Sequence, residues 1–238
     1  MESIFDYEHP FVCTDAVIFT IRTQVPDSYR KLPEMSLRVL LYLRDTDPHK
    51  DCWCLPGGFL NIDELPEDNI RRKLSVKTDI GECRLEQLHT FCDVNRDPRG
   101  RVISIAYLGL MNEALSTGIE DKAVWAELTF DDNDVLMLKI DGDVLRGTDI
   151  GFDHRMMIRM ALERLQSDML HSGEIFSLLP EEFTLTEFQN VYEAVLGKKE
   201  QTANFRRKTA HMVKETDGYT KDKGHRPAKL YKKAEAAE

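Results

Sequence analysis

The stretch LPGGFLNIDELPEDNIRRKLSVKTDI, residues 55–80, determines the fold of the larger part of the chain. Its paired glycines, Gly57 and Gly58, predict a turn, and the residues after the turn predict one long amphipathic helix. Three apolar runs typical of β-strands flank this segment, at residues 11–21, 37–44 and 101–111. Strands around one long helix predict an α/β or α+β sandwich.

The same stretch resembles the Nudix box, a catalytic signature written G-x5-E-x7-R-E-U-x-E-E-x-G-U, where U is a bulky aliphatic residue. Gly58, Glu64 and Arg72 stand where the box has its first glycine, its first glutamate and its arginine. The other three glutamates of the box are replaced, by Lys73, Val76 and Lys77.

These replacements remove a metal site. Residues three and four apart lie on one helix face, so glutamates at positions 73, 76 and 77 would converge on one cation. A hard cation such as Mg²⁺ needs oxygen ligands. A lysine ammonium has only hydrogen-bond donors, and a valine side chain has no polar atom at all. The sequence therefore predicts no metal site, no cofactor and no Nudix hydrolase activity.

The C-terminal part has a different charge from the rest. Residues 197–233 contain twelve Lys and Arg against four Asp and Glu, a net of +8, although the whole chain has a net charge of -10. Thr184 and Glu187 have the spacing of a capping box before the apolar positions of TLTEFQNVYEAVLG, and Gly197 follows as a C-terminal cap. A second, basic helix starting near Thr202 and a basic hairpin ending in AKLYKK complete the layout of a winged helix-turn-helix.

Between these two parts, residues 151–170 predict a further helix, with Phe152, Met156, Met160, Leu162 and Leu165 on its apolar side. We expect a Nudix-like mixed-sheet domain at residues 1–150, a connecting amphipathic helix at 151–177 and a winged helix-turn-helix domain at 178–238. The segment NRDPRGR, residues 95–101, predicts a tight turn between two strands.

Several segments together resemble one family. They are FVCTDAVIFTI, CWCLPGGFL, LEQLHTFCDVNRDPRGRVISIAYLGL, FDH before ALERL, FTLTEFQNVYEAVLG, NFRRK and GHRPAKLY. They resemble the NrtR-type transcriptional regulators, Nudix-related repressors of bacterial NAD metabolism, over nearly the whole chain. The resemblance implies a ligand-sensing Nudix domain, often with a degenerate box, and a winged helix that binds operator DNA.

The function that this resemblance implies is a repressor of NAD or niacin genes whose inactive Nudix domain senses ADP-ribose or a related nucleotide. Two alternatives stay open: a repressor of the same family that answers to arabinose or xylose, and a weak ADP-ribose pyrophosphohydrolase that uses substitute acids such as Glu64, Glu82 or Glu86. The expected partners are a small-molecule effector, a second copy of the chain and double-stranded palindromic operator DNA.

The candidate ligand-binding residues belong to the Nudix box and its surroundings: Trp53, Gly58, Glu64, Arg72, Lys73 and Lys77. Lys73 and Lys77 are one turn apart and would offset the charge of a pyrophosphate directly, in place of a metal. Trp53 would stack on a base. The alternative is that both lysines lie on an exposed helix face and have no role in binding.

The candidate DNA-binding residues lie in the second helix and the wing. Asn suits adenine and Arg suits guanine, so we expect Asn204, Arg206 and Arg207 near base edges. Lys208, His211 and Lys214 would lie nearer phosphates, and the wing residues would meet the DNA backbone or the minor groove. The full set is Thr202, Asn204, Arg206, Arg207, Lys208, His211, Lys214, Lys221, Lys223, His225, Arg226 and Lys229.

The composition places this chain among cytoplasmic proteins. Hydrophobic residues make up 42% and charged residues 31%, and no apolar run approaches the length of a membrane span. The five cysteines, an odd number, favour free thiols in a reducing compartment. The first ten residues carry no Lys or Arg, so we expect neither a secretory signal nor a membrane partner.

Overall fold

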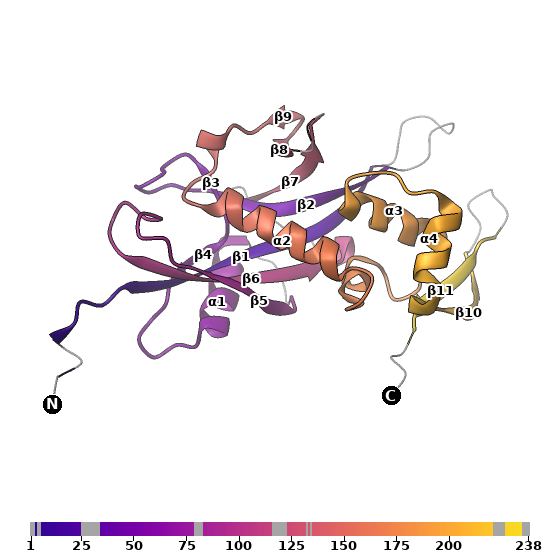
Figure 1. Ribbon diagram of the computed structural model, residues 1–238, viewed down its shortest axis with the longest axis horizontal. Coiled ribbons are helices and arrows are strands. Elements are labelled where there is room, and N and C mark those ends of the chain that lie inside the picture. The colour runs from indigo at the N-terminus through magenta and orange to yellow at the C-terminus, as the bar shows by residue number, and fades with distance from the viewer. Residues whose placement is uncertain are drawn as a thin grey trace.

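The computed structural model describes residues 3, 6–24, 34–78, 83–115, 123–131, 133, 135–220 and 227–234, without the side chains of Lys77 and Glu113. Nine strands in these residues form one sheet (Figure 1). They are β1 (Phe11–Gln24), β2 (Glu34–Leu43), β3 (Trp53–Cys54), β4 (Gly57–Phe59), β5 (Leu85–Phe91), β6 (Val102–Met111), β7 (Ala123–Phe130), β8 (Leu136–Ile140) and β9 (Asp143–Val144).

The sheet is mixed, as the sequence predicts. The strand order is β5-β6-β1-β2-β7-β8-β9, while β3 pairs with β2 and β4 pairs with β1. Strands β1 and β6 run parallel, with Asp15 opposite Ala106, and the neighbouring pairs are antiparallel. The predicted turn at residues 95–101 lies between β5 and β6.

Four α-helices and several 3-10 turns accompany the strands in the described residues. They are α1 (Pro66–Thr78), η2 (Glu113–Leu115), η3 (Gly147–Asp149), α2 (His154–Asp168), η4 (Glu174–Leu178), α3 (Leu185–Leu196), α4 (Thr202–Thr209) and η5 (Ala210–Met212). The last two strands, β10 (Val213–Tyr219) and β11 (Lys229–Lys233), form a separate antiparallel pair.

Both faces of the sheet pack against a hydrophobic core. The side chains of β1 point alternately to one core and to the other. Ala16 and Ile18 pack with Ile70 and Leu74 of α1 on one face. Val17 and its odd-numbered neighbours face the other core, which contains the buried side of α2. The result is the expected sandwich, with α1 and α2 on opposite sides of the sheet.

Helix α2 is shorter than the predicted segment, and its buried side agrees with the prediction in part: Leu162 and Leu165 are buried, but Met156 is not. It begins at His154 and ends at Asp168, and its buried residues include Met157, Ile158 and Ala161. The prediction for Met156 was wrong, because its side chain is 51% exposed. A core on one side of the helix needs neighbours at a period of 3.6 residues, and Met157 rather than Met156 has that phase with Ala161 and Leu165.

The C-terminal domain has the winged-helix layout that the sequence predicts. Thr184 caps α3 and accepts a hydrogen bond from the backbone N–H of Glu187, while Gly197 ends the helix with a left-handed φ of 75°. The basic helix that the sequence predicts near Thr202 is α4, which begins at Thr202 and has Gln201 as its N-cap. Backbone hydrogen bonds between Phe183 and Tyr231 attach β11 to the start of α3.

One hydrophobic core continues from the sheet through α2 into the winged-helix domain. It contains Phe19 of β1, Leu162 of α2, Phe188 of α3 and Phe205 of α4. Figure 1 shows α2 crossing the sheet, with its C-terminal end towards the domain that holds α3 and α4. The two domains therefore share packed side chains, and α2 lies between them.

None of the described helices is long and apolar enough to span a membrane.

Candidate functional site

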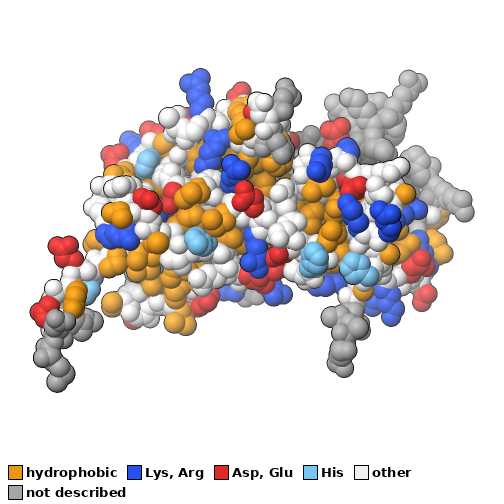
Figure 2. Space-filling model, in the orientation of Figure 1, with side chains coloured by type: hydrophobic (Ala, Val, Ile, Leu, Met, Phe, Trp, Pro, Cys, Tyr) orange, Lys and Arg blue, Asp and Glu red, His pale blue; other side chains and the backbone are white. Residues whose placement is uncertain are grey.

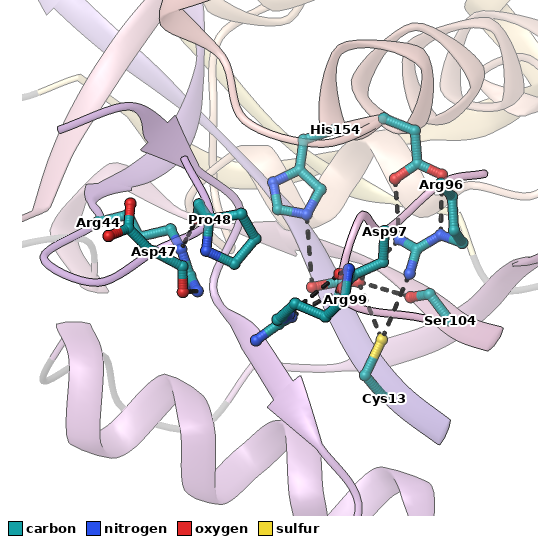
Figure 3. Close-up of polar contacts among 11 residues, drawn as sticks. Cys13, Arg44, Asp47, Pro48, Arg96, Asp97, Arg99, Ser104 and His154 are labelled. Atoms are coloured by element: carbon teal, nitrogen blue, oxygen red, sulfur yellow. Dashed lines mark hydrogen bonds and ion pairs between the residues drawn. The ribbon is translucent and has the colours of Figure 1, made fainter. Parts of the chain in front are cut away.

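A cleft of about 200 Å³ lies at the end of the sheet where β1, β4 and α1 meet the start of α2. Four of its lining residues are cations, and three others have aromatic rings. The cations are Arg44, Lys73, Arg96 and Arg99, and the aromatic residues are Tyr42, Phe59 and Phe152. Figure 3 shows how the polar side chains of this cleft face one another.

The two glycines of the box allow the cleft to form. A Cβ atom at Gly57 would lie 2.2 Å from Oδ1 of Asp15, and one at Gly58 would lie 2.7 Å from Cε of Lys73. Any larger residue would push these side chains away. Gly58 and Lys73 are thus neighbours, and the Lys73 ammonium lies against the glycine loop on the wall of the cleft.

A buried charge network forms the floor of the cleft. Arg96 donates to both carboxylate oxygens of Asp153, with N···O distances of 3.0 and 2.8 Å, and its Nη2 lies 3.7 Å from Oδ2 of Asp15. Ser104 donates to the same Asp15 oxygen at 2.6 Å. Arg96 is 8% exposed and Asp15 is 6% exposed, so the network is nearly closed to water. Buried charges of this kind are stable only when paired.

His154, the first residue of α2, joins this network as a neutral ring. The backbone N–H of Leu55 donates to Nδ1 of His154 at 3.0 Å, which requires a lone pair on that nitrogen. The ring proton therefore lies on Nε2, which is 3.7 Å from Oδ1 of Asp15. His154 is buried, and both of its nitrogens connect α2 to the strands of the cleft.

Cations and rings alternate at the mouth of the cleft. The Arg99 guanidinium lies 5.0 Å from the ring centre of Phe59 and 5.7 Å from that of Phe152. Arg44 lies 5.3 Å from the same Phe152 ring. Burial alone would raise the pKa of Asp97, but hydrogen bonds from Arg99 hold it below its ordinary value. The mouth therefore presents positive charge and flat apolar surface, which suit a phosphate and a planar ring.

The cleft offers no ready nucleophile from its thiol or its phenol. Burial, reinforced by the nearby Asp15 carboxylate, raises the pKa of Cys13 to about 12. Burial likewise raises the pKa of Tyr42 to about 12. Both groups are neutral at physiological pH, and a neutral thiol is a poor nucleophile. The cations and aromatic rings of the cleft are groups that can bind a ligand.

Glu64 and Arg72 bond to each other outside the cleft lining. Arg72 donates to the two carboxylate oxygens of Glu64 at 2.7 and 2.6 Å, and Asn69 donates to the same carboxylate at 2.9 Å. These hydrogen bonds, those of Arg72 first, lower the pKa of Glu64 to about 2. The pair fixes the loop before α1 to the helix, so in this structure both residues have a structural role.

The remaining candidates for ligand binding have different positions. Trp53 packs against the core beside Leu43 and Ile150 and does not line the cleft. The side chain of Lys77 lies outside the described part of the chain. Of the six candidates, Gly58 and Lys73 are the two that the structure places in the cleft wall.

The residues at the box positions do not fit Mg²⁺. Lys73 has no lone pair to offer a cation, Val76 is 77% exposed and apolar, and Glu64 is occupied by Arg72. Glu86 of β5, a possible substitute acid, forms an ion pair with Arg84 just before that strand, and Glu82 lies outside the described residues. The described side chains at these positions therefore offer no set of free carboxylates for Mg²⁺.

Sequence reasoning missed most of the cleft. It read residues 95–101 only as a turn, although Arg96, Asp97 and Arg99 of that turn line the cleft. Arg44 was missed as well. The available signal was the number of charged residues in the turn, which exceeds what a hairpin connection needs. His154, the last residue of the FDH segment, is a buried ring that accepts a hydrogen bond.

The winged-helix domain presents a second candidate site, on α4. Arg206 and Arg207 are exposed, whereas Phe205 and Thr209 of the same helix are buried. Asn204 accepts a hydrogen bond from Arg207 at 3.3 Å, so these two side chains lie together on the exposed face. Figure 2 shows Lys and Arg side chains on this end of the molecule. Such a helix has the shape and charge to enter a DNA groove.

Of the other DNA-binding candidates, Thr202 and Lys208 belong to α4, and the rest follow it in the chain. Thr202, His211 and Lys214 are exposed, Lys208 forms an ion pair with Glu200 at 2.6 Å, and Lys229 lies 4.5 Å from the ring centre of Tyr219. Four candidates of the wing lie outside the described residues: Lys221, Lys223, His225 and Arg226.

Comparisons with known proteins agree with this architecture. Residues 175–232 match the family model of the NrtR DNA-binding winged helix domain. The chain is 33% identical over 236 residues to the ADPR responsive transcriptional repressor NtrR of Acinetobacter baylyi, covering 95% of this chain and 83% of that protein. It is 32% identical to NrtR of Shewanella oneidensis in a crystal structure with a 27mer DNA, with a TM-score of 0.65, covering 94% of this chain and 93% of that one.

A further relative is an enzyme. An ADP-ribose pyrophosphatase of Methanocaldococcus jannaschii is 32% identical over 136 residues, which are 57% of this chain and 70% of that protein.

Proposed function

Because the chain belongs to the NrtR-type family of Nudix-related transcriptional regulators, we propose that it is a ligand-responsive repressor of NAD or niacin metabolism genes. Its Nudix-like domain binds ADP-ribose or a related nucleotide, and its winged helix binds operator DNA. Occupation of the cleft favours a geometry of the protein that no longer fits the operator. The protein acts on DNA as a homodimer in the bacterial cytoplasm.

The observation that carries the proposal is the cationic, aromatic cleft, whose wall includes Lys73 at a position where the Nudix box has a glutamate. Lys73, Arg44 and Arg99 can neutralise a pyrophosphate without Mg²⁺, and Phe152 or Phe59 can stack on a base. A neutral sugar such as arabinose or xylose has no charge that would use these cations. The cleft therefore favours a nucleotide over a sugar.

Regulation rather than catalysis is the function that family membership supports. We attribute the lack of hydrolysis to Lys73, Val76 and Lys77, which stand where an enzyme would have glutamates. The alternative hydrolase function rests on the pyrophosphatase relative and on the retained Glu64.

On DNA, α4 enters the major groove with Asn204, Arg206 and Arg207 towards the bases. The wing, with Lys229, contacts the backbone. One short basic helix binds DNA weakly. The two protomers of a dimer, each on one half-site of a palindrome, together provide the affinity that one lacks. Half-sites one or two helical turns apart, at about 34 Å per turn, match such a dimer.

The test begins by selecting an operator with the purified protein from random duplex DNA. Binding of the selected duplex is then measured by fluorescence anisotropy with ADP-ribose, AMP, arabinose or xylose added. We expect ADP-ribose to release the duplex and the sugars to leave it bound. Release by a sugar alone would show that the effector is a sugar rather than a nucleotide. Failure to select any duplex at low salt would contradict the proposed repressor function.

The hydrolase alternative is tested separately by following AMP formation from ADP-ribose with Mg²⁺ or Mn²⁺. We expect no turnover above the rate without protein. Turnover that disappears in Glu64→Gln would instead establish an enzyme, because that substitution removes the carboxylate but keeps the size of the side chain.

A further inference from the structure

We propose that α2 transmits occupation of the cleft to the DNA-binding domain, and that the buried Arg96–Asp153 ion pair connects it to the cleft. The proposal rests on the proposed function, since it explains how an effector in the cleft reaches the operator site. It assigns a role to Asp153 and Gln166, which lie outside the cleft lining.

The start of α2 is attached to the cleft by three consecutive side chains. The Phe152 ring centre lies 5.3 Å from the Arg44 guanidinium and 5.7 Å from that of Arg99, and its backbone has a φ of 53°, which a bulky residue rarely adopts. Asp153 bonds to Arg96, and His154 bonds to the backbone of Leu55. A ligand that binds Arg44 and Arg99 must therefore act on the residues that begin this helix.

Asp153 uses its carboxylate in an unusual way for its position. It is the N-cap of α2, where an aspartate ordinarily accepts a hydrogen bond from its own helix. Its side chain makes no such bond. Both of its oxygens instead accept from Arg96, which comes from the turn between β5 and β6. The helix start is thus fixed to the cleft floor rather than to its own first turn.

The other end of α2 is attached to the DNA-binding domain. Gln166 donates through Nε2 to the backbone carbonyl of Val195 in α3, at 2.9 Å. Leu162 and Leu165 belong to the core that also contains Val195 and Phe188 of α3. The helix has 15 residues and is about 22 Å long. A packed helix of this length moves as one body, so a shift at Asp153 becomes a shift at Gln166.

The experiment measures coupling rather than binding. The affinity of the selected operator duplex is determined with and without saturating ADP-ribose, and the ratio of the two dissociation constants is the coupling. We expect a ratio on the order of 5 to 150 for the wild-type protein, the range typical of allosteric proteins. The affinity for ADP-ribose is measured separately by calorimetry.

Two variants interrupt the connection at opposite ends. Asp153→Asn keeps the shape but loses one of the two charged contacts to Arg96, and Gln166→Met keeps the length but removes the donor to α3. We expect the coupling ratio to fall towards one in both variants, and we expect Gln166→Met, which is remote from the cleft, to keep both separate affinities within about threefold of wild type. Arg164→Lys is the matched control on the exposed side of α2, and it should keep the wild-type ratio.

A wild-type ratio in folded Asp153→Asn and Gln166→Met would overturn the inference. If Asp153→Asn loses affinity for either ligand, Gln166→Met decides alone, because it is remote from the cleft. A wild-type protein whose operator binding ignores ADP-ribose removes the proposed function and this inference together. That outcome can be told apart from a failure of this inference alone, because it is measured on the wild-type protein before any variant is made.

Discussion

At the scale of single residues, positive charge in the cleft stands where a metal site would be. Lys73 lies against Gly58, and Arg99 and Arg44 lie against aromatic rings at the mouth. A phosphate that binds there accepts charge-assisted hydrogen bonds from fixed donors. On the proposed function, this arrangement would bind the phosphates of an effector without the metal that hydrolysis uses.

Replacing Lys73 tests this interpretation. Lys73→Met keeps the aliphatic stem but loses the ammonium, and a hydrogen bond to a charged group contributes about 1.5–3 kcal/mol. We expect ADP-ribose to bind about ten- to a hundredfold more weakly in calorimetry. Lys139→Met on β8 is the matched control and should bind as wild type. An unchanged affinity in Lys73→Met would assign the lysine to the exposed-face alternative.

Glu64 gives a prediction about acid stability. Its pKa is about 2 in the folded protein and about 4.5 in an unfolded chain, so the folded state binds fewer protons between these values. The stability that Glu64 contributes is therefore complete above pH 4.5 and is lost as the pH falls towards 2. The difference in unfolding free energy between wild type and Glu64→Gln should shrink over that range in urea titrations.

The control for Glu64 is Glu163→Gln, which removes an exposed carboxylate that pairs with Arg159 on α2. Its effect on stability should be small at every pH, because exposed pairs contribute little. A Glu64→Gln difference that stays constant from neutral to acid pH would show that the ion pair with Arg72 does not form.

The sequence predicted residues whose role is local and missed those whose partners are distant. Gly58, Glu64 and Arg72 could be found because their spacing follows one motif within a short stretch of the chain. Arg96 could not, since its partner Asp153 is 57 residues away and the fold alone brings them together. Trp53 was chosen for its chemistry, but its neighbours in the core determine where it lies.

At the scale of elements, α3 shows how much the local sequence determines. Its capping box and its glycine cap form as predicted, because both use hydrogen bonds within a few residues. The same glycine has a second role that the sequence could not reveal. A Cβ atom at Gly197 would lie 2.3 Å from Cε2 of Phe130 in β7, so the end of α3 packs closely on the sheet.

Gly197→Ala should therefore destabilise the protein. The left-handed backbone alone costs about 1–2 kcal/mol for a residue with a Cβ, and the contact with Phe130 adds to that. Urea unfolding measures the change. Gly147→Ala is the matched control, since a Cβ there meets nothing within 4 Å, and it should leave stability unaltered. Equal stabilities of the two variants would contradict the packing of α3 on β7.

Helix α4 carries the prediction for DNA. Each arginine that reads a guanine contributes about 1–3 kcal/mol, so Arg206→Gln and Arg207→Gln should each weaken operator binding by about fivefold or more. Anisotropy at several salt concentrations measures this effect. The control is Arg159→Gln, which removes one positive charge from the exposed side of α2. This variant should bind the duplex as the wild-type protein does. If both α4 variants bind the duplex as the wild-type protein does, the DNA-binding surface does not lie on α4.

At the scale of the whole molecule, a sensor domain and a DNA-binding domain share one core. The sequence separated them by charge and by pattern. It could not show that Phe19, Leu162 and Phe188 pack into a continuous core, because such contacts join parts far apart in the chain. This continuity gives an effector in the cleft a physical path to the operator.

Recognition of a nucleotide by the cleft's own cations, without a metal, underlies the whole proposed mechanism. The decisive experiment is the release of the selected operator duplex by ADP-ribose, titrated once with Mg²⁺ and once with excess EDTA. We expect the same midpoint in both titrations, within about twofold, because lysine and arginine rather than a metal bind the phosphates. Release that requires Mg²⁺ and disappears with EDTA would contradict recognition by cationic side chains alone.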